Sequence, residues 1–217
     1  MLGLDAPTLI SRLITLVIAF TIHELAHAWT ADQLGDDTPR RMGRLTLNPL
    51  VHLDPIGSLL LLVAGFGWAK PVQVSPYRLR YGPQLGMAIV AVAGPFSNLV
   101  MALLAAIPFR FGVVSVFDAF GTPGAFLPSP AAFLGEFIFL NLILLLFNLL
   151  PIAPLDGSKI LRGFAPREWG GVLTQLEQWG PFILMALVFL GSFGSFSILG
   201  LLIGQPANFL FGKILGL

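Results

Sequence analysis

The sequence predicts an all-α membrane protein: a polytopic helical bundle of about four full spans, one re-entrant or short segment and a small β element at the membrane face. Apolar residues make up 56% of the 217-residue chain and charged residues only 11%. The mean hydropathy of +0.86 lies far outside the range of soluble globular proteins. A bilayer of about 30 Å is therefore the environment that this composition indicates.

Five apolar segments define the predicted spans. Four of them, at about 8–31, 84–109, 131–150 and 181–203, are long enough to cross a bilayer as helices. The fifth, at 57–69, is short and rich in glycine, which favours a re-entrant element that protein or water must cover. The first span lacks a basic segment and a small-residue cleavage site, so we interpret it as a retained helix and not a signal peptide.

The basic residues indicate the orientation. If 57–69 does not cross, nine of the twelve Lys and Arg residues share one side, which the positive-inside rule places in the cytoplasm. Only Arg12, Arg110 and Lys213 fall on the other side, and both termini are then outside. The net charge of +1 and the lack of a basic stretch argue against a nucleic-acid partner.

Two stretches on the predicted cytoplasmic side do not follow a helical pattern. RLTLNP (44–49) and KPVQVSP (70–76) alternate apolar and polar residues and end in proline, as short edge strands do. They predict a small sheet at the membrane face. The alternative is that both are extended loops.

The first span contains the motif HExxH, formed by His23, Glu24 and His27. Side chains at i and i+4 share one helix face, so both imidazoles can reach a single zinc ion. Glu24 is then placed to act as a general base toward a metal-bound water. Because apolar residues surround the motif, it predicts metal-dependent hydrolysis within a membrane, near the cytoplasmic end of the helix.

Two residues compete to be the third zinc ligand, and the chain has no cysteine that could serve. Asp156 follows the third span, where Pro151 and Pro154 prevent a regular helix and Gly157 permits an unusual turn. The spacing is equally compatible with Asp156 as the N-cap of a following helix. His52 lies on the same predicted side and is the other candidate ligand.

Asn98 is a polar residue inside the second predicted span. Such an amide needs a partner, and small residues around it allow a neighbouring helix to come close. Asn98 therefore either holds two helices together or acts as a donor that positions a substrate or polarises its carbonyl group.

Four segments carry a family resemblance: TIHELAHAW (21–29), GRLTLNPLVHLDPIG (43–57), AGPFSNL (93–99) and FNLLPIAPLDGSKIL (147–161). In this order they resemble the site-2 proteases, which are intramembrane zinc metalloproteases. The resemblance covers about residues 10–165. It implies a minimal form of the family, without the PDZ or CBS domains that other members carry.

The resemblance also assigns roles. It implies one Zn²⁺ per chain, held by His23, His27 and Asp156, with Glu24 as the catalytic base. It implies substrate-binding or outer-shell roles for three further residues: Asn98, which matches an Asn thought to help hold the substrate, His52 and Asn148. We expect a single intramembrane metalloprotease domain over 1–217, with its catalytic core at about 10–165 and a C-terminal helix at about 181–203.

These features favour a zinc endopeptidase that cleaves single-pass membrane proteins in or near their transmembrane segments. We expect it in the lipid bilayer of a prokaryotic cell membrane, with its active site opening toward the cytoplasm. The alternative is a membrane metal-ion transporter or metal-binding protein, because intramembrane His and Asp can mark an ion path. A permeation path needs polar residues at successive depths, and outside the proposed site Asn98 is nearly the only one in a span interior.

Overall fold

The structure, a computed structural model, describes residues 5–57, 67–119, 126–193 and 197–217. Four helices in this part are long and apolar enough to cross a membrane. They are α1 (Ala6–Gln33), α4 (Pro83–Arg110), α6 (Pro130–Asn148) and α8 (Gly170–Phe193). The predicted all-α, polytopic class is confirmed.

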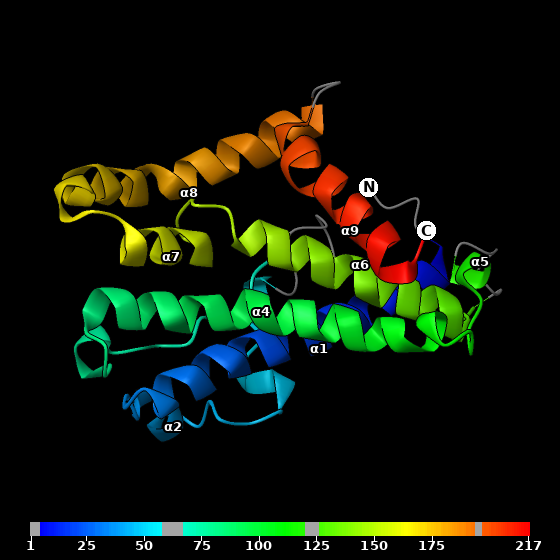
Figure 1. Cartoon of the computed structure of the whole chain (residues 1–217), viewed down its shortest axis with the longest axis horizontal. Helices are drawn as coiled ribbons and strands as arrows, with labels where there is room; N and C mark the ends of the chain where they lie inside the picture. Colours follow the sequence, from blue (N-terminus) through cyan, green and yellow to red (C-terminus); the bar gives the residue numbers. More distant parts are fainter. Residues whose placement is uncertain (1–4, 58–66, 120–125, 194–196) are drawn as a thin grey trace.

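Shorter elements connect and cover these helices. They are α2 (Thr38–Arg41), η1 (Pro49–Val51), η2 (Pro76–Arg78), α5 (Val116–Ala119), α7 (Asp156–Phe164), η3 (Arg167–Trp169), the π-helical turn η4 (Gly200–Gly204) and α9 (Gln205–Leu215). Helices α1, α4 and α6 pack against one another, and α7 packs on α4. In Figure 1, α8 (yellow to orange) extends along the side of the molecule opposite α1 (blue).

Polar residues cap the first turns of two of the long helices. The Asp5 carboxylate accepts a hydrogen bond from the Thr8 amide at 2.8 Å at the start of α1. The Ser129 hydroxyl accepts one from the Ala132 amide at 3.1 Å at the start of α6. Each side chain satisfies an amide that has no partner within its helix, which fixes where the helix begins.

The core lies where α4, α6 and α9 meet. Ala102 and Ala106 of α4 are buried against Ile138 and Leu142 of α6, with Ala207 of α9 completing the cluster. Small residues allow the helix backbones to approach closely, which is how helices associate when lipid surrounds them. This packing fixes the register of α4 against α6 near the polar residues of the site.

The predicted boundaries of the fourth span are wrong. Helix α8 begins at Gly170 instead of 181 and ends at Phe193 instead of 203, and a separate helix, α9, follows. The segment before 181 carries polar residues, so its hydropathy does not predict a span. In the structure it is helical, with Leu173 buried and Glu177 in an ion pair with Arg162 of α7 at 2.5 Å.

The predicted strands at 44–49 and 70–76 are also wrong, since within the described ranges neither segment forms a strand. Among the described residues, the β pairing near them is an isolated bridge between Leu53 and Ala69. The Arg44 guanidinium donates to the carbonyl groups of Val51 and Lys70. The two loops are therefore joined by a side chain and not by the main-chain hydrogen bonds of a sheet. The alternative interpretation, extended loops, is the one that fits. The predicted re-entrant segment at 57–69 lies largely outside the described residues.

Candidate metal centre

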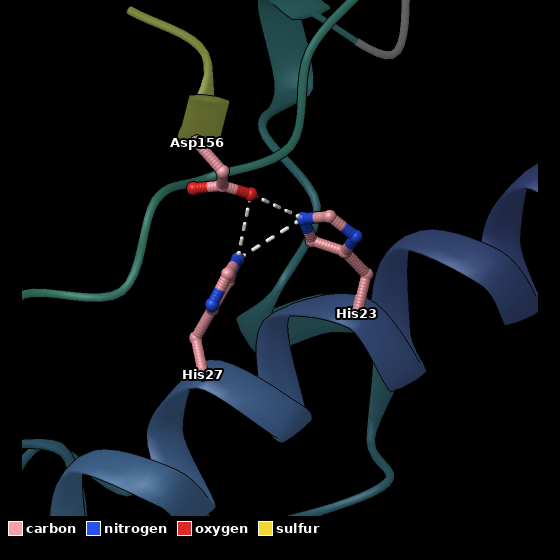
Figure 2. Close-up of side chains that lie close together, drawn as sticks. All are labelled: His23, His27 and Asp156. Carbon is pink, nitrogen blue, oxygen red and sulfur yellow. Dashed lines mark hydrogen bonds and ion pairs between the residues drawn. The ribbon is translucent and has the colours of Figure 1, made fainter. Parts of the chain in front are cut away.

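Three side chains converge in a buried cluster formed by α1 and the first residue of α7 (Figure 2). The Nε2 atoms of His23 and His27 are 3.0 Å apart. Oδ2 of Asp156 lies 3.1 Å from Nε2 of His23 and 3.0 Å from Nε2 of His27. All three residues are buried. Two imidazoles and a carboxylate form a ligand set typical of a catalytic zinc site.

The chain reaches this point through a break between α6 and α7. A Cβ atom at Gly157 would lie 2.2 Å from the carbonyl oxygen of Leu150, so only glycine allows the start of α7 to pack under the end of α6. The residue at the cap position of α7 is Leu155, and the Asp156 carboxylate caps none of the helix amides. The N-cap alternative for Asp156 is therefore wrong.

Lys159, one turn further along α7, interacts with the other oxygen of Asp156. Its Nζ atom donates to Oδ1 at 3.1 Å, which leaves Oδ2 directed toward the imidazoles. A carboxyl group must be ionised to bind a metal, and the ammonium group of Lys159 favours that form of Asp156.

The hydrogen bonds of the two imidazoles show whether the site suits a cation. Nδ1 of His27 lies 2.7 Å from the carbonyl oxygen of Val90, which can only accept, so Nδ1 carries the proton. Nδ1 of His23 lies 2.7 Å from Oδ1 of Asn98 and donates in the same way. Imidazole binds a metal in its neutral form, which has one N–H, so in that form both Nε2 atoms present lone pairs to each other and to Oδ2 of Asp156.

Three electron pairs at this separation repel one another unless a cation lies among them. Ligand atoms of a tetrahedral zinc ion, each about 2.0–2.1 Å from the metal, are about 3.3 Å apart. The observed separations of 3.0–3.1 Å are close to that value. The residues present therefore fit zinc.

Gly94 of α4 borders the same space. A Cβ atom at this position would lie 2.4 Å from Nε2 of His27 and 2.5 Å from Nε2 of His23. Gly94 is one of the small residues around Asn98 in the sequence, and no local pattern marks it as facing the metal ligands.

Glu24 lies beside the ligands and is buried. Its Oε2 atom accepts a hydrogen bond from the amide of Val72 at 3.0 Å. Val72 belongs to the loop whose Lys70 carbonyl accepts a hydrogen bond from the Arg44 guanidinium. Burial lowers the pKa of the Arg44 guanidinium, and the Glu24 carboxylate opposes that shift. Sequence reasoning missed Val72, because a main-chain donor leaves no trace in the residue type.

The site opens on a cavity of about 520 Å³. Its walls are mainly apolar and come from α1, α6, the loop around Pro71 and Leu184 of α8. Along α1 the lining extends from Leu9 to His27. Arg12 lies near the end of the cavity away from the metal ligands and forms an ion pair with Glu136 of α6 at 2.5 Å. The cavity is thus a long apolar groove with a polar group at each end.

The remaining predicted site residues differ in their distance from the centre. Asn98 is fully buried and contacts a ligand, His23, and does not line the cavity within the described part of the chain. Asn148 lines the cavity, and its Nδ2 donates to the Leu144 carbonyl at 3.0 Å. His52 is not in the ligand cluster, since its Nε2 bonds the Thr46 carbonyl at 2.8 Å.

The long apolar helices and the His, His, Asp cluster beside a glutamate define a membrane protein with a metallohydrolase type of site. The chain is 44% identical over 185 residues to "Putative zinc metalloprotease YwhC" of Bacillus subtilis (strain 168), covering 84% of this chain and 81% of that protein. It is 30% identical over 175 residues to "Putative zinc metalloprotease MJ0611" of Methanocaldococcus jannaschii, covering 80% and 72%. The chain belongs to the zinc metalloprotease family that these relatives represent.

A further relative is "Putative zinc metalloprotease Rip2" of Mycolicibacterium smegmatis, 34% identical over 176 residues, which are 79% of this chain and 64% of Rip2. The chain therefore spans slightly less than two thirds of the length of Rip2. No family model matches the chain, and no solved structure matches it. The names of the relatives and the ligand cluster both support zinc as the metal.

Proposed function

We propose that the protein is an intramembrane zinc endopeptidase of the site-2 protease type, which cleaves single-pass membrane proteins in or near their transmembrane segments. The observation that carries the proposal is the location of the ligands. His23 and His27 lie within a helix suited to cross a membrane, beside an apolar cavity. An apolar groove next to a hydrolytic centre favours a hydrophobic segment as substrate.

The chemistry requires a base beside an electrophilic centre. When bound by His23, His27 and Asp156, zinc supplies Lewis-acid activation of water and of a carbonyl group. Glu24 accepts the proton from the attacking water and passes it to the leaving amine. The Val72 amide holds the Glu24 carboxylate in place through its bond to Oε2.

Substrate recognition needs partners for an unwound backbone. A substrate helix bonds its own amides internally, so its scissile bond is shielded until the helix unwinds locally. The loop at 70–75 borders the cavity and forms neither helix nor strand, and within the described residues no hydrogen bond engages the main-chain groups of Gln73 and Val74. We propose that this loop pairs with the unwound segment as an added strand.

The orientation that we propose places the active site toward the cytoplasm of a prokaryotic cell, where the majority of the Lys and Arg residues would lie. Single cysteines in place of Asp37 and Gln73 test it, because the chain has no native cysteine. Both should react with a membrane-impermeant reagent only from the cytoplasmic side. Labelling of positions 37 and 73 from opposite sides would contradict the orientation.

The decisive experiment co-expresses the protein with a panel of tagged single-pass membrane proteins and maps the cut by mass spectrometry. The expected cut lies in or near a transmembrane segment, is lost on zinc chelation and is absent with Glu24→Gln. Cleavage confined to soluble domains would overturn the intramembrane assignment. Zinc uptake into proteoliposomes without any cleavage would instead favour the transporter.

A further inference from the structure

Asn141 is a buried residue of α6 that touches neither histidine, yet it is linked to one of them. Its Nδ2 atom donates to the main-chain carbonyl of Phe137 at 2.9 Å. Its Oδ1 atom accepts from Nδ2 of Asn98 at 2.9 Å. Oδ1 of Asn98 in turn lies 2.7 Å from Nδ1 of His23. The hydrogen bonds therefore run through three helices, from α6 through α4 to α1.

The donor and the acceptor of every hydrogen bond in this series are determined at its α6 end. The carbonyl oxygen of Phe137 can only accept, so Asn141 must present its NH₂ group there and its oxygen toward Asn98. Asn98 must then present its NH₂ group to Asn141 and its oxygen to His23. An oxygen at that place requires a proton on Nδ1 of His23, which leaves Nε2 free to bind a metal.

We propose that Asn141 is a positioning residue that fixes the tautomer of His23 and thereby its competence as a zinc ligand. The two histidines differ in this respect. Nδ1 of His27 bonds the main-chain carbonyl of Val90, which cannot turn round. Nδ1 of His23 depends on a side-chain amide, and a free amide can present its oxygen or its nitrogen. The hydrogen bond from Asn98 to Asn141 holds the Asn98 amide with its oxygen toward His23.

Asn98 and Asn141 are both fully buried, so bulk solvent does not reach these groups. If Asn141 were absent, Asn98 could turn and offer its NH₂ group to Nδ1 of His23. That contact selects the tautomer with the proton on Nε2, which has no lone pair for zinc. Removing an outer hydrogen-bond partner of a metal ligand typically weakens metal binding about 10–100-fold.

The first test measures the dissociation constant for zinc by chelator competition on the purified full-length protein, with no substrate present. Asn141→Ala should raise the dissociation constant about 10–100-fold. Ile138→Ala is the packing control, because Ile138 is likewise fully buried on α6 but its side chain makes no hydrogen bond. It should leave zinc affinity unchanged. Equal zinc affinity of Asn141→Ala and the wild type would overturn the proposal.

A second variant separates tautomer control from packing. Both oxygens of an aspartate accept, so Asn98→Asp offers His23 an acceptor in either orientation. In the Asn141→Ala background, Asn98→Asp should recover most of the lost zinc affinity. In the wild-type background it should weaken zinc binding, because its carboxylate would face Oδ1 of Asn141. Weaker binding in both backgrounds would assign Asn141 a packing role only.

The metal-free wild-type protein provides a test that needs no variant of Asn141. With ¹⁵N-labelled histidine, and His23 assigned by comparison with His23→Gln, the ring shifts report which nitrogen is protonated. We expect the proton on Nδ1 of His23 at neutral pH. A proton on Nε2 would overturn the proposal even if Asn141→Ala failed to fold. Because these measurements concern zinc and not the substrate, their outcome is independent of the proposed intramembrane proteolysis.

Discussion

Replacing Gly94 with alanine places a methyl group where the structure leaves space for the metal. The new Cβ atom would lie 2.4 Å from Nε2 of His27 and 2.5 Å from Nε2 of His23. An ordinary contact is about 3.5 Å, so each imidazole would have to retreat by about 1 Å. Zinc–ligand distances tolerate only about 0.2 Å. We therefore expect Gly94→Ala to weaken zinc binding at least about 100-fold, or about 2.7 kcal/mol.

The assay is zinc stoichiometry by elemental mass spectrometry, with affinity from chelator competition. Alanine is the most favourable residue in a helix interior, so the substitution should leave the helicity of α4 intact. Gly171→Ala is the matched control, because a Cβ atom at Gly171 of α8 meets nothing within 4 Å. It should retain full zinc. If Gly94→Ala bound zinc with wild-type affinity, the space beside the two Nε2 atoms would not be the metal position.

The other predictions concern the ligands and the base. Glu24→Gln should abolish cleavage but keep one zinc per chain, and loss of the metal would contradict its role as base. Asp156→Ala should lower zinc occupancy sharply while His52→Ala keeps most of it, and elemental analysis showing the reverse would make His52 the ligand. Arg44→Lys should slow cleavage about tenfold with zinc retained, because a compact ammonium group lacks the planar fork with which the guanidinium reaches both carbonyls. Unchanged turnover would show that the loop bearing Val72 does not need this contact.

The spans and the site core follow from features that the sequence displays directly. An apolar run long enough to cross a bilayer predicts a helix, and three of the four long helices lie within a few residues of their predicted bounds. His23 and His27 are fixed relative to each other by one helical turn. The residues alone do not identify Asp156 as the third ligand, because its position beside the two histidines depends on the close contact that Gly157 permits between α6 and α7.

The remaining features depend on contacts between distant segments. The polar first half of α8 is not apolar enough for hydropathy to predict it, and there Glu177 pairs with Arg162 of α7, a contact that no local pattern marks. The two loops in which apolar and polar residues alternate are joined by the Arg44 side chain and do not pair as strands. Alternation alone therefore predicted a sheet that the structure does not contain in these segments. The link from Asn141 to His23 exists only once three helices have packed in register, and no local pattern marks it.

The metal ligands are 129 residues apart in the chain, from His27 near the start to Asp156 at the beginning of α7. Membrane proteins are synthesised from the N-terminus, so α1 enters the bilayer long before α7 emerges from the ribosome. During that interval the HExxH motif lacks its carboxylate ligand. The metal centre is therefore completed late in biosynthesis, and a chain interrupted before α7 would lack the third ligand.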